Sequence, residues 1–297
     1  MGTKENFRSG YVSVAGFPNV GKSTLLNRLI GSKLSIVSPK PQTTRSTMRG
    51  ILTTDKAQII FLDTAGIHRP KDKLGDYMVN SIKMTFHEAD VIYLMVESTP
   101  PRSHDIDLIG QVKEAGKTTF LIINKIDLVK KDTLLPLIDH YRNVMEFDEI
   151  VPVSALKGDN VDRLLELTVS CLPEAPAYFP EDIVSDQIER EFISEFIREK
   201  VYLNTREEIP YSTAVVIEDM KEREGGGAYI MATIYLEKDS QKGIVIGSGG
   251  KMVKKIGEDA RREIEQFLGY PVYLDLQVKV EKKWRGKTAS LKKLGYR

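Results

Sequence analysis

Apolar residues in the first half of the chain follow two alternating patterns. Short continuous apolar runs are typical of strands buried on both faces of a parallel sheet, and longer stretches carry apolar residues at helical spacing. The expected strands are 11–15, 51–52, 57–62, 91–96, 118–123 and 150–153, and the expected helices are 22–30, 77–86, 105–115, 134–145 and 161–172. This alternation predicts an α/β fold with a parallel sheet and right-handed crossovers.

The second half of the chain has a different order of elements. They are a helix (185–201), two strands (212–217 and 228–236), an apolar segment (244–246), a helix (251–268) and a strand (272–280). The glycines at 225–227 favour a hairpin between the first two strands. The prolines of segment 173–180 favour an extended linker between the halves. We therefore expect an α/β domain at 1–178 and a smaller α+β domain at 179–297.

Charge is distributed unevenly along a chain of otherwise ordinary composition. With 41% hydrophobic and 29% charged residues, the 297 residues suit two globular domains. The net charge is +1, yet residues 181–241 carry 7 Lys/Arg against 15 Asp/Glu (−8), and residues 242–297 carry 14 against 6 (+8). The C-terminal segment is therefore strongly basic, which the overall balance hides.

The cysteine content and the apolar runs indicate the cellular compartment of the protein. Cys171 is the single cysteine, so no intramolecular disulfide forms, and its place in a helical apolar pattern predicts a core residue. The N-terminus lacks the apolar region of a signal peptide, and no stretch approaches the ~18 to 20 apolar residues of a membrane span. We expect a cytoplasmic protein; its basic tail is compatible with peripheral association at the inner face of the membrane.

A glycine-rich turn joins the first expected strand to the first expected helix. Gly16, Gly21, Lys22 and Ser23 fit the spacing G-x-x-x-x-G-K-[ST], which curls backbone N–H groups around a triphosphate at a helix N-terminus. The glycines allow close approach of the backbone, Lys22 would reach the β- and γ-phosphates, and Ser23 would give its hydroxyl to Mg²⁺. Thr24, the next residue, is also expected at the nucleotide. The motif does not indicate the base.

The base is indicated by an N-K-x-D motif made of Asn124, Lys125 and Asp127, directly after an expected strand. A carboxylate at Asp127 can accept two hydrogen bonds from the N1–H and 2-amino group of guanine, and adenine offers no such donor pair. Ser154, Ala155 and Leu156 follow another expected strand, and this segment could offer a backbone N–H to the guanine carbonyl. These residues together predict a guanine site.

Two further loops are expected at the γ-phosphate. Asp63 ends a buried strand and is placed to hold Mg²⁺ through a water, while Gly66 would give a backbone N–H to the γ-phosphate. The second hydroxyl that the metal needs would come from Thr44 or, alternatively, from Thr43. Both loops are expected to order with GTP and to relax after hydrolysis.

A second glycine loop lies in the basic C-terminal part. It consists of Gly247, Ser248, Gly249 and Gly250. A dinucleotide fingerprint would need a glycine where Met252 stands, whereas the G-x-x-G loop of a KH domain, which clamps about four nucleotides of single-stranded nucleic acid, fits. The next helix carries Lys251 and Lys254 opposite its apolar face, so we expect both at the nucleic acid. Trp284 in the tail either stacks on a base or closes the domain by packing.

The segments GFPNVGKS, QTTR, DTAG, NKID and SAL, in this order, resemble the translation-factor-related class of bacterial GTPases. The QTTR loop and the helix-strand-strand-helix-helix-strand order, which is similar to a type II KH domain, narrow the resemblance to the Era family. The resemblance implies hydrolysis of GTP to GDP with Mg²⁺, binding of the 3′ region of small-subunit (16S) ribosomal RNA, and a role in assembly of that subunit. We expect a monomer.

One position departs from Ras-type enzymes. Ile67 follows DTAG where those enzymes carry the glutamine that orients the attacking water. Members of the family are thought to compensate with a monovalent cation, and Asn19 matches the residue that would ligate K⁺. Because Ile67 cannot orient water, slow intrinsic turnover is expected.

Two alternative functions stay open: an RNA-binding assembly module with a structural nucleotide, and a metabolic P-loop kinase that uses ATP.

Overall fold

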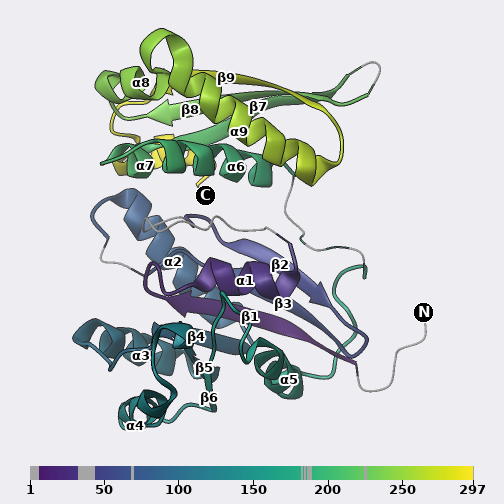
Figure 1. The fold of residues 1–297 in the computed structure, drawn as a ribbon, viewed down its shortest axis with the longest axis vertical. Helices are drawn as coiled ribbons and strands as arrows, with labels where there is room; N and C mark the ends of the chain where they lie inside the picture. Colours follow the sequence, from purple (N-terminus) through teal and green to yellow (C-terminus); the bar gives the residue numbers. More distant parts are fainter. Residues whose placement is uncertain are drawn as a thin grey trace. The chain divides into compact units, whose positions relative to one another are not determined.

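The chain divides into two compact units, each built around its own sheet (Figure 1). The first unit comprises Met1–Arg69 and Met78–Asp186, and the second comprises Pro70–Tyr77 and Gln187–Arg297. The computed structural model describes residues 7–32, 44–67, 70–181, 183, 185, 189–223 and 226–296.

A six-stranded sheet in the order β2-β3-β1-β4-β5-β6 forms the centre of the first unit. Its strands are β1 (Arg8–Gly16), β2 (Met48–Thr53), β3 (Ala57–Asp63), β4 (Val91–Glu97), β5 (Thr118–Asn124) and β6 (Glu149–Pro152). Neighbours pair in parallel except β2 and β3, which are antiparallel. The connection 54–56 is too short for a crossover, so the expected parallel sheet carries one antiparallel edge strand.

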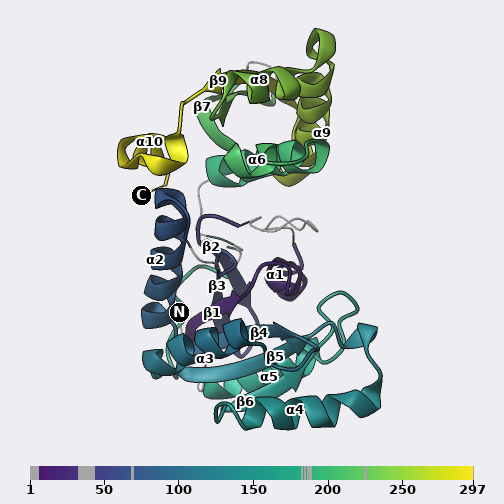
Figure 2. The ribbon, with the colours of Figure 1, turned by 90° about the vertical axis from the view of Figure 1, so that its left-hand side faces the viewer.

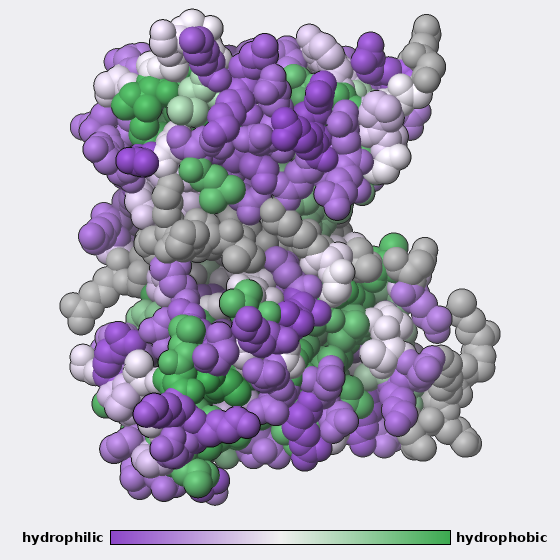
Figure 3. Space-filling view, viewed as in Figure 1, coloured by the Kyte–Doolittle hydropathy of each residue, from purple (hydrophilic) through white to green (hydrophobic). Residues whose placement is uncertain are grey.

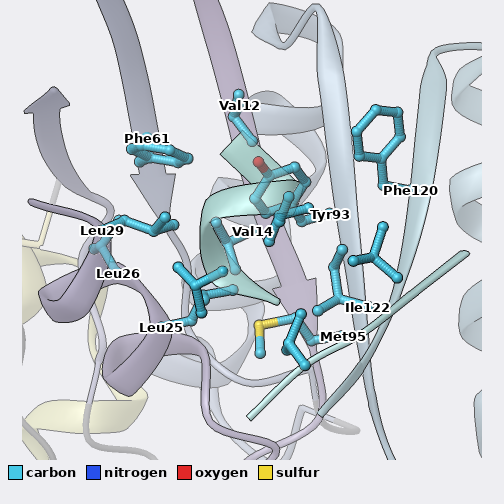
Figure 4. Close-up of a cluster of buried hydrophobic side chains, with 14 of the residues drawn as sticks. Val12, Val14, Leu25, Leu26, Leu29, Phe61, Tyr93, Met95, Phe120 and Ile122 are labelled. Carbon is cyan, nitrogen blue, oxygen red and sulfur yellow. The ribbon is translucent and has the colours of Figure 1, made fainter. Parts of the chain in front are cut away.

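Helices cover both faces of this sheet (Figure 2). They are α1 (Lys22–Ile30), α2 (Lys73–Glu88), α3 (Ser103–Ala115), α4 (Leu134–Arg142) and α5 (Val161–Cys171), with the 3₁₀ turns η1 (Ile126–Leu128) and η2 (Lys131–Thr133). On one face α1 and α5 bury an apolar cluster in which Leu25, Leu26 and Leu29 of α1 meet the strands (Figure 4). Each such leucine contributes roughly 1.5–3 kcal/mol by burial, so α1 is held firmly where the first glycine loop ends.

The sheet order gathers the expected site residues at one edge. The first glycine loop follows β1, Asp63 ends β3, Asn124 ends β5, and Ser154 comes shortly after β6. Because these strands are parallel, their carboxyl ends lie at the same edge, where open α/β sheets bind ligands. The fold therefore brings together residues that are up to about 140 positions apart in the sequence.

The proline-rich segment after α5 is bound to the first sheet. The side-chain oxygen of Gln58 accepts hydrogen bonds from the backbone N–H groups of Tyr178 (2.8 Å) and Phe179 (2.9 Å), and its amide nitrogen donates to the Phe179 carbonyl (2.8 Å). Phe179 and Ile183 also pack on an apolar cluster of β2 and β3. The first compact unit therefore extends to Asp186, beyond the domain boundary that the sequence predicted after residue 178.

The second unit has a three-stranded sheet in the order β7-β8-β9. Its elements are α6 (Glu189–Asn204), α7 (Ile209–Ser212), β7 (Ala214–Glu222), β8 (Ala228–Leu236), α8 (Asp239–Ile246), η3 (Ser248–Gly250), α9 (Lys251–Leu268), β9 (Val272–Val280), η4 (Trp284–Gly286) and α10 (Thr288–Lys293). Strands β7 and β8 are antiparallel, while β8 and β9 are parallel because α8 and α9 form the crossover between them. Helices α6, α8 and α9 lie on one face (Figure 2).

Two local expectations change in the structure. The strand expected from residue 212 begins at Ala214, because Ile209–Ser212 forms the short helix α7 with Pro210 in its first turn. Cys171 is exposed and not part of the core, since Leu172, 1% exposed, continues the inward stripe of α5. None of the helices in the described part of the chain has the length and apolar character that crossing a membrane requires.

Candidate functional site

The first glycine loop approaches the guanine motif closely. Gly21 caps α1 in the left-handed region (φ 103°), and a Cβ there would collide with the side-chain nitrogen of Asn124. That nitrogen donates to the Val20 carbonyl at 2.7 Å. Asn19 is exposed and also has a left-handed backbone (φ 67°). The loop therefore needs glycine at position 21 so that the phosphate and base segments can meet.

Lys22 is buried at the start of α1, with 7% of its surface exposed. Its Nζ donates to the carbonyls of Gly16 and Phe17, each at 3.0 Å. Burial lowers the pKa of Lys22 to about 8, and the nearby Asp63 carboxylate opposes that shift. A desolvated ammonium whose hydrogen bonds go to carbonyls is suited to an anionic partner, because phosphate oxygens would stabilise its protonated form.

Three side-chain oxygens from three separate segments converge beside Lys22. Ser23 Oγ donates to Asp63 Oδ2 at 3.1 Å, and Thr44 Oγ1 lies 3.3 Å from both of these atoms. Asp63 is fully buried and Thr44 nearly so. Hydroxyl and carboxylate oxygens are ligands that a hard divalent cation prefers, so the set fits Mg²⁺. The alternative residue, Thr43, lies outside the described residues, as does most of its loop.

The DTAG segment after β3 packs directly on the first glycine loop. The Ile67 N–H donates to the Gly16 carbonyl at 3.1 Å. A Cβ at Gly66 would lie 2.7 Å from the backbone nitrogen of Pro18, so only glycine fits there. This contact places the Gly66 backbone at the phosphate side of the loop, as expected for a γ-phosphate sensor. Thr24 lies one residue beyond Ser23 in the first turn of α1.

Asn124 joins the phosphate segment to the loop after β6. Besides its bond to Val20, its side-chain oxygen accepts from the Ala155 N–H at 2.9 Å. Of the N–H groups in segment 154–156, from which the sequence suggested a donor for guanine, that of Ala155 is therefore engaged by Asn124. This leaves the N–H of Leu156, the next residue, as the candidate donor for a base carbonyl.

Asp127 is oriented by the same loop. Ser154 Oγ donates to Asp127 Oδ1 at 2.6 Å and accepts from the Lys157 N–H at 3.1 Å. One carboxylate oxygen of Asp127 is thus fixed by Ser154, which sets the direction of the other. The structure thereby brings Asn124, Asp127, Ser154 and Ala155 together, as the sequence predicts.

Lys125 forms an ion pair that the sequence did not reveal. Its Nζ lies 2.5 Å from the Glu97 carboxylate at the end of β4, and Ser98 Oγ donates to its backbone carbonyl at 3.2 Å. Hydrogen bonding to Lys125 holds the pKa of Glu97 below its usual value. Lys125 also has a left-handed backbone (φ 66°), which the hydrogen bond to its carbonyl stabilises.

The second glycine loop has the backbone that the G-x-x-G pattern requires. Gly247, Gly249 and Gly250 all have positive φ (73°, 60° and 78°), and a Cβ at Gly247 would lie 2.7 Å from Met252 Cβ. Ser248 is exposed at the tip, and exposed Lys251 begins α9. Backbone N–H groups at the first turn of a helix favour an anion such as phosphate.

A groove of about 310 Å³ lies between β9 and α9, the helix that follows this loop. It is lined by Val253, Lys254, Gly257, Glu258, Arg261, Tyr273, Leu274 and Leu276. The face of the second unit that carries α9 is mainly hydrophilic (Figure 3). Leu274 and Leu276 of β9 are partly buried, and they form an apolar floor between charged walls. Sequence reasoning missed Arg261 and Tyr273, because only the parallel pairing of β9 places that strand beside α9.

Trp284 is a packing residue of the second unit. It is fully buried, its Nε1–H donates to the Ser212 carbonyl at 2.9 Å, and its ring stacks on Tyr296 at a centroid distance of 5.7 Å. Base stacking would need an exposed ring face. Of the two roles left open for Trp284, the structure supports closure of the domain.

The fold and these two sites define a class: a P-loop GTPase domain followed by a KH domain. Residues 11–125 match the family described as 50S ribosome-binding GTPase, and residues 208–285 match the KH domain. The chain is 50% identical over 293 residues to the GTPase Era of Ruminiclostridium cellulolyticum, covering 98% of each chain.

Solved structures give the same result. The chain resembles a variant Era of Aquifex aeolicus bound to GDP and AlF₄⁻, with a TM-score of 0.95 and 43% identity over 98% of this chain and 99% of that one. Equal values relate it to an Era in complex with MgGDPNP and nucleotides 1506–1542 of 16S ribosomal RNA. The chain belongs to the Era family of GTPases, and the family and the fold expected from the sequence are confirmed.

Proposed function

We propose that this GTPase hydrolyses GTP to GDP and phosphate, and that its nucleotide state controls binding of the 3′ region of 16S ribosomal RNA by the KH domain during assembly of the small ribosomal subunit. The observation that carries the proposal is the presence of two complete sites in one chain. Lys22, Ser23, Asp63 and Asp127 meet at one sheet edge, and the G-x-x-G loop leads into α9, which forms one wall of the groove between α9 and β9.

In the proposed nucleotide site, this chain's residues divide the work between base and phosphates. Asp127 would accept from the N1–H and 2-amino group of guanine, while Lys22 and the first turn of α1 would hold the β- and γ-phosphates. Mg²⁺, held by Ser23 and Thr44 with Asp63 behind it, would neutralise charge on the β- and γ-phosphates. Thr44 and Gly66 would meet only the γ-phosphate end, so their loops would respond to its loss.

Turnover is proposed to be slow without a further cation. Ile67 has an apolar side chain where a water-orienting group is needed, so positioning of water must come from elsewhere. We propose K⁺ as the compensating cation and Asn19, exposed in the phosphate loop, as its ligand. Replacing K⁺ by Na⁺ at equal ionic strength should then lower the single-turnover rate in the intact protein and have no effect in Asn19→Ala.

In the proposed RNA site, single-stranded RNA follows the groove from the second glycine loop. The exposed backbone at Ser248 and Gly249, with Lys251 and Lys254, would hold phosphates, and Leu274 and Leu276 would lie under the bases. The chemistry of the lining supports this path, since it combines cations with an apolar floor.

The coupling is tested by RNA affinity in two nucleotide states. A labelled RNA corresponding to nucleotides 1506–1542 of 16S ribosomal RNA should bind more tightly with MgGDPNP than with GDP, by fluorescence anisotropy at one salt concentration. Equal affinities would refute the coupling. Single-turnover hydrolysis with and without this RNA separates it from the alternative, because a structural nucleotide would stay uncleaved.

A pair of arginines on α9 tests the RNA path itself. Arg261 lines the groove, whereas its neighbour Arg262 is more exposed and pairs with Asp259. Arg261→Ala should weaken RNA binding by about fivefold to tenfold and Arg262→Ala by less than about twofold, because only the first loses a groove contact. Equal losses would show that charge alone acts.

Cellular location and assembly state also enter as proposals. We propose a monomer in the cytoplasm, whose basic C-terminal segment allows peripheral association with the inner face of the membrane. Sedimentation velocity of the purified chain and its partition between cytosolic and membrane fractions test these points, and a dimer or a purely membrane-bound pool would refute them.

A further inference from the structure

Arg28, in the last turn of α1, contacts the loop that follows β6. Its Nε donates to the Ala155 carbonyl at 2.6 Å, and its Nη2 donates to the Leu156 carbonyl at 2.5 Å. The turn at Gly158 closes around the guanidinium, because a Cβ on that glycine would lie 2.9 Å from Nη1. A planar guanidinium holds two neighbouring acceptors in a fixed geometry, which a lysine cannot do.

This clamp fixes the direction of one backbone N–H. In a trans peptide the carbonyl and the following N–H point in opposite directions within one plane. Because the Ala155 carbonyl is turned toward Arg28, the Leu156 N–H points away from the guanidinium. The orientation of this donor is therefore set from outside the loop.

The other N–H groups of the loop are used internally. Ala155 donates to Asn124 at 2.9 Å, Lys157 donates to Ser154 Oγ at 3.1 Å, and Gly158 donates to the Ser154 carbonyl at 2.7 Å. Within the part of the chain that the structure describes, the Leu156 N–H has no acceptor. The Leu156 residue is 66% exposed.

We propose that Arg28 is a positioning residue for guanine recognition, which aims the Leu156 N–H at the 6-carbonyl of the base. The inference rests on the proposed assignment of guanine to Asp127 and this loop. Since α1 also begins at Lys22, one rigid helix would orient both ends of the nucleotide: its first turn holds the phosphates and its last turn sets the donor for the base. The sequence gives no signal for this role, because Arg28 belongs to none of the motifs.

Two nucleotide analogues separate the donor from the carboxylate. IDP lacks the 2-amino group that Asp127 would read but keeps the 6-carbonyl, whereas 6-thio-GDP keeps both donors and replaces the carbonyl by a weaker acceptor. Affinities of GDP, IDP and 6-thio-GDP are measured by titration calorimetry for the full chain and for Arg28→Met and Arg28→Lys. Arg163→Met, on the exposed side of α5, serves as the matched control.

Arg28→Met should weaken GDP binding about tenfold, the size expected for one lost or misdirected hydrogen bond. It should bring the GDP to 6-thio-GDP affinity ratio close to one and leave the GDP to IDP ratio unchanged. Arg28→Lys should fall between, since it keeps one donor. Thermal melts of each variant check that the fold is retained.

Contrary outcomes are distinct. Unchanged ratios in Arg28→Met, or an equal fall of both ratios, would overturn the positioning role, because the second result means a general loosening of the pocket. A fall of the 6-thio ratio in Arg163→Met as well would also overturn it. If the full chain did not prefer GDP over IDP, the assignment of guanine to Asp127 would fail first, independently of Arg28.

Discussion

At the scale of single residues, the guanine selection that we propose depends on one carboxylate that the fold orients. Ser154 holds one oxygen of Asp127 at 2.6 Å, which leaves the other oxygen with a defined direction. A base that covers this carboxylate must satisfy it, so a base without the matching donors leaves a polar group unpaired and binds more weakly.

Asp127→Asn should change the preferred base from guanine to xanthine. An amide can donate to the 2-carbonyl of xanthine but cannot accept both donors of guanine, so GTP affinity should fall by about 100-fold and XTP affinity should rise. Competition between fluorescent GDP and each triphosphate measures both changes. Asp132→Asn, at an exposed carboxylate of η2, is the control. An unchanged preference, or a shift to ATP as a P-loop kinase would show, would contradict the guanine site.

The pKa of Lys22 predicts proton uptake on nucleotide binding. Burial lowers this pKa to about 8 in the free protein, and the phosphates should raise it again. Below about pH 8 Lys22 is protonated in both states, whereas above it binding must take up a proton, so affinity should fall as pH rises through about 8.

Calorimetry in two buffers of different ionisation enthalpy measures this uptake directly. At pH 8.5 the full chain should take up a fraction of a proton per GDP bound, and at pH 6.5 Lys22 should contribute none. Lys22→Met should show no such uptake at pH 8.5. The prediction is contradicted if the variant and the full chain take up equal amounts.

At the scale of elements, each site is formed where a helix begins. α1 starts at Lys22 and α9 starts at Lys251, and each follows a glycine with a left-handed backbone. Such glycines turn the chain sharply enough to present the first N–H groups of the helix to an anion. The same local device thus serves a nucleotide in one unit and, as we propose, RNA in the other.

The short turn η4 after β9 closes the second unit through Trp284. Trp284→Phe removes the bond to the Ser212 carbonyl and part of the stacking on Tyr296, so the free energy of unfolding should fall by about 1–3 kcal/mol. Urea unfolding measures the loss. RNA affinity of the folded variant should stay within about twofold, because the buried indole cannot reach a base. Weaker RNA binding at unchanged stability would restore the stacking role.

At the scale of the whole molecule, charge is segregated along the chain. Residues 181–241 have a balance of −8 (7 against 15) and residues 242–297 one of +8 (14 against 6), although the net charge is only +1. The basic segment includes the second glycine loop and α9, so its field favours a polyanion at the groove. Residues 1–180 carry 22 basic and 21 acidic residues, so no comparable excess of positive charge is found there.

RNA binding should consequently depend on salt with a defined slope. If about four phosphates are held at the loop and groove, log K should fall with log[salt] with a slope of about −3. Anisotropy titrations over a range of salt concentrations, with the nucleotide state fixed, measure it. Lys254→Ala should make the slope less steep by about one unit. A slope near zero would mean that phosphate contacts do not carry the binding.

The sequence predicts much of the fold because its signals are local. Continuous apolar runs gave most strands of the first unit, and glycine spacing gave both loops. Local signals fail where pairing decides the outcome: β2 is antiparallel because its connection to β3 is short, and Leu274 and Leu276 line a groove because β9 pairs with β8. The prediction that Cys171 lies in the core was wrong for a related reason. Cys171 and Leu172 are neighbours with apolar side chains, and only the folded structure shows that Leu172 faces inward.

What the sequence determined by itself is the chemistry of the two sites. Lys22, Ser23, Asp63, Asn124 and Asp127, and the loop at 247–250, could be assigned from residue type and spacing, because phosphate, metal and guanine each demand particular groups. Tertiary structure alone decided which atoms are already engaged: the Ala155 N–H by Asn124, Trp284 by Ser212, and the Ala155 carbonyl by Arg28. Hydrogen-bond partners far apart in the chain depend on folded distances, and no local pattern encodes them.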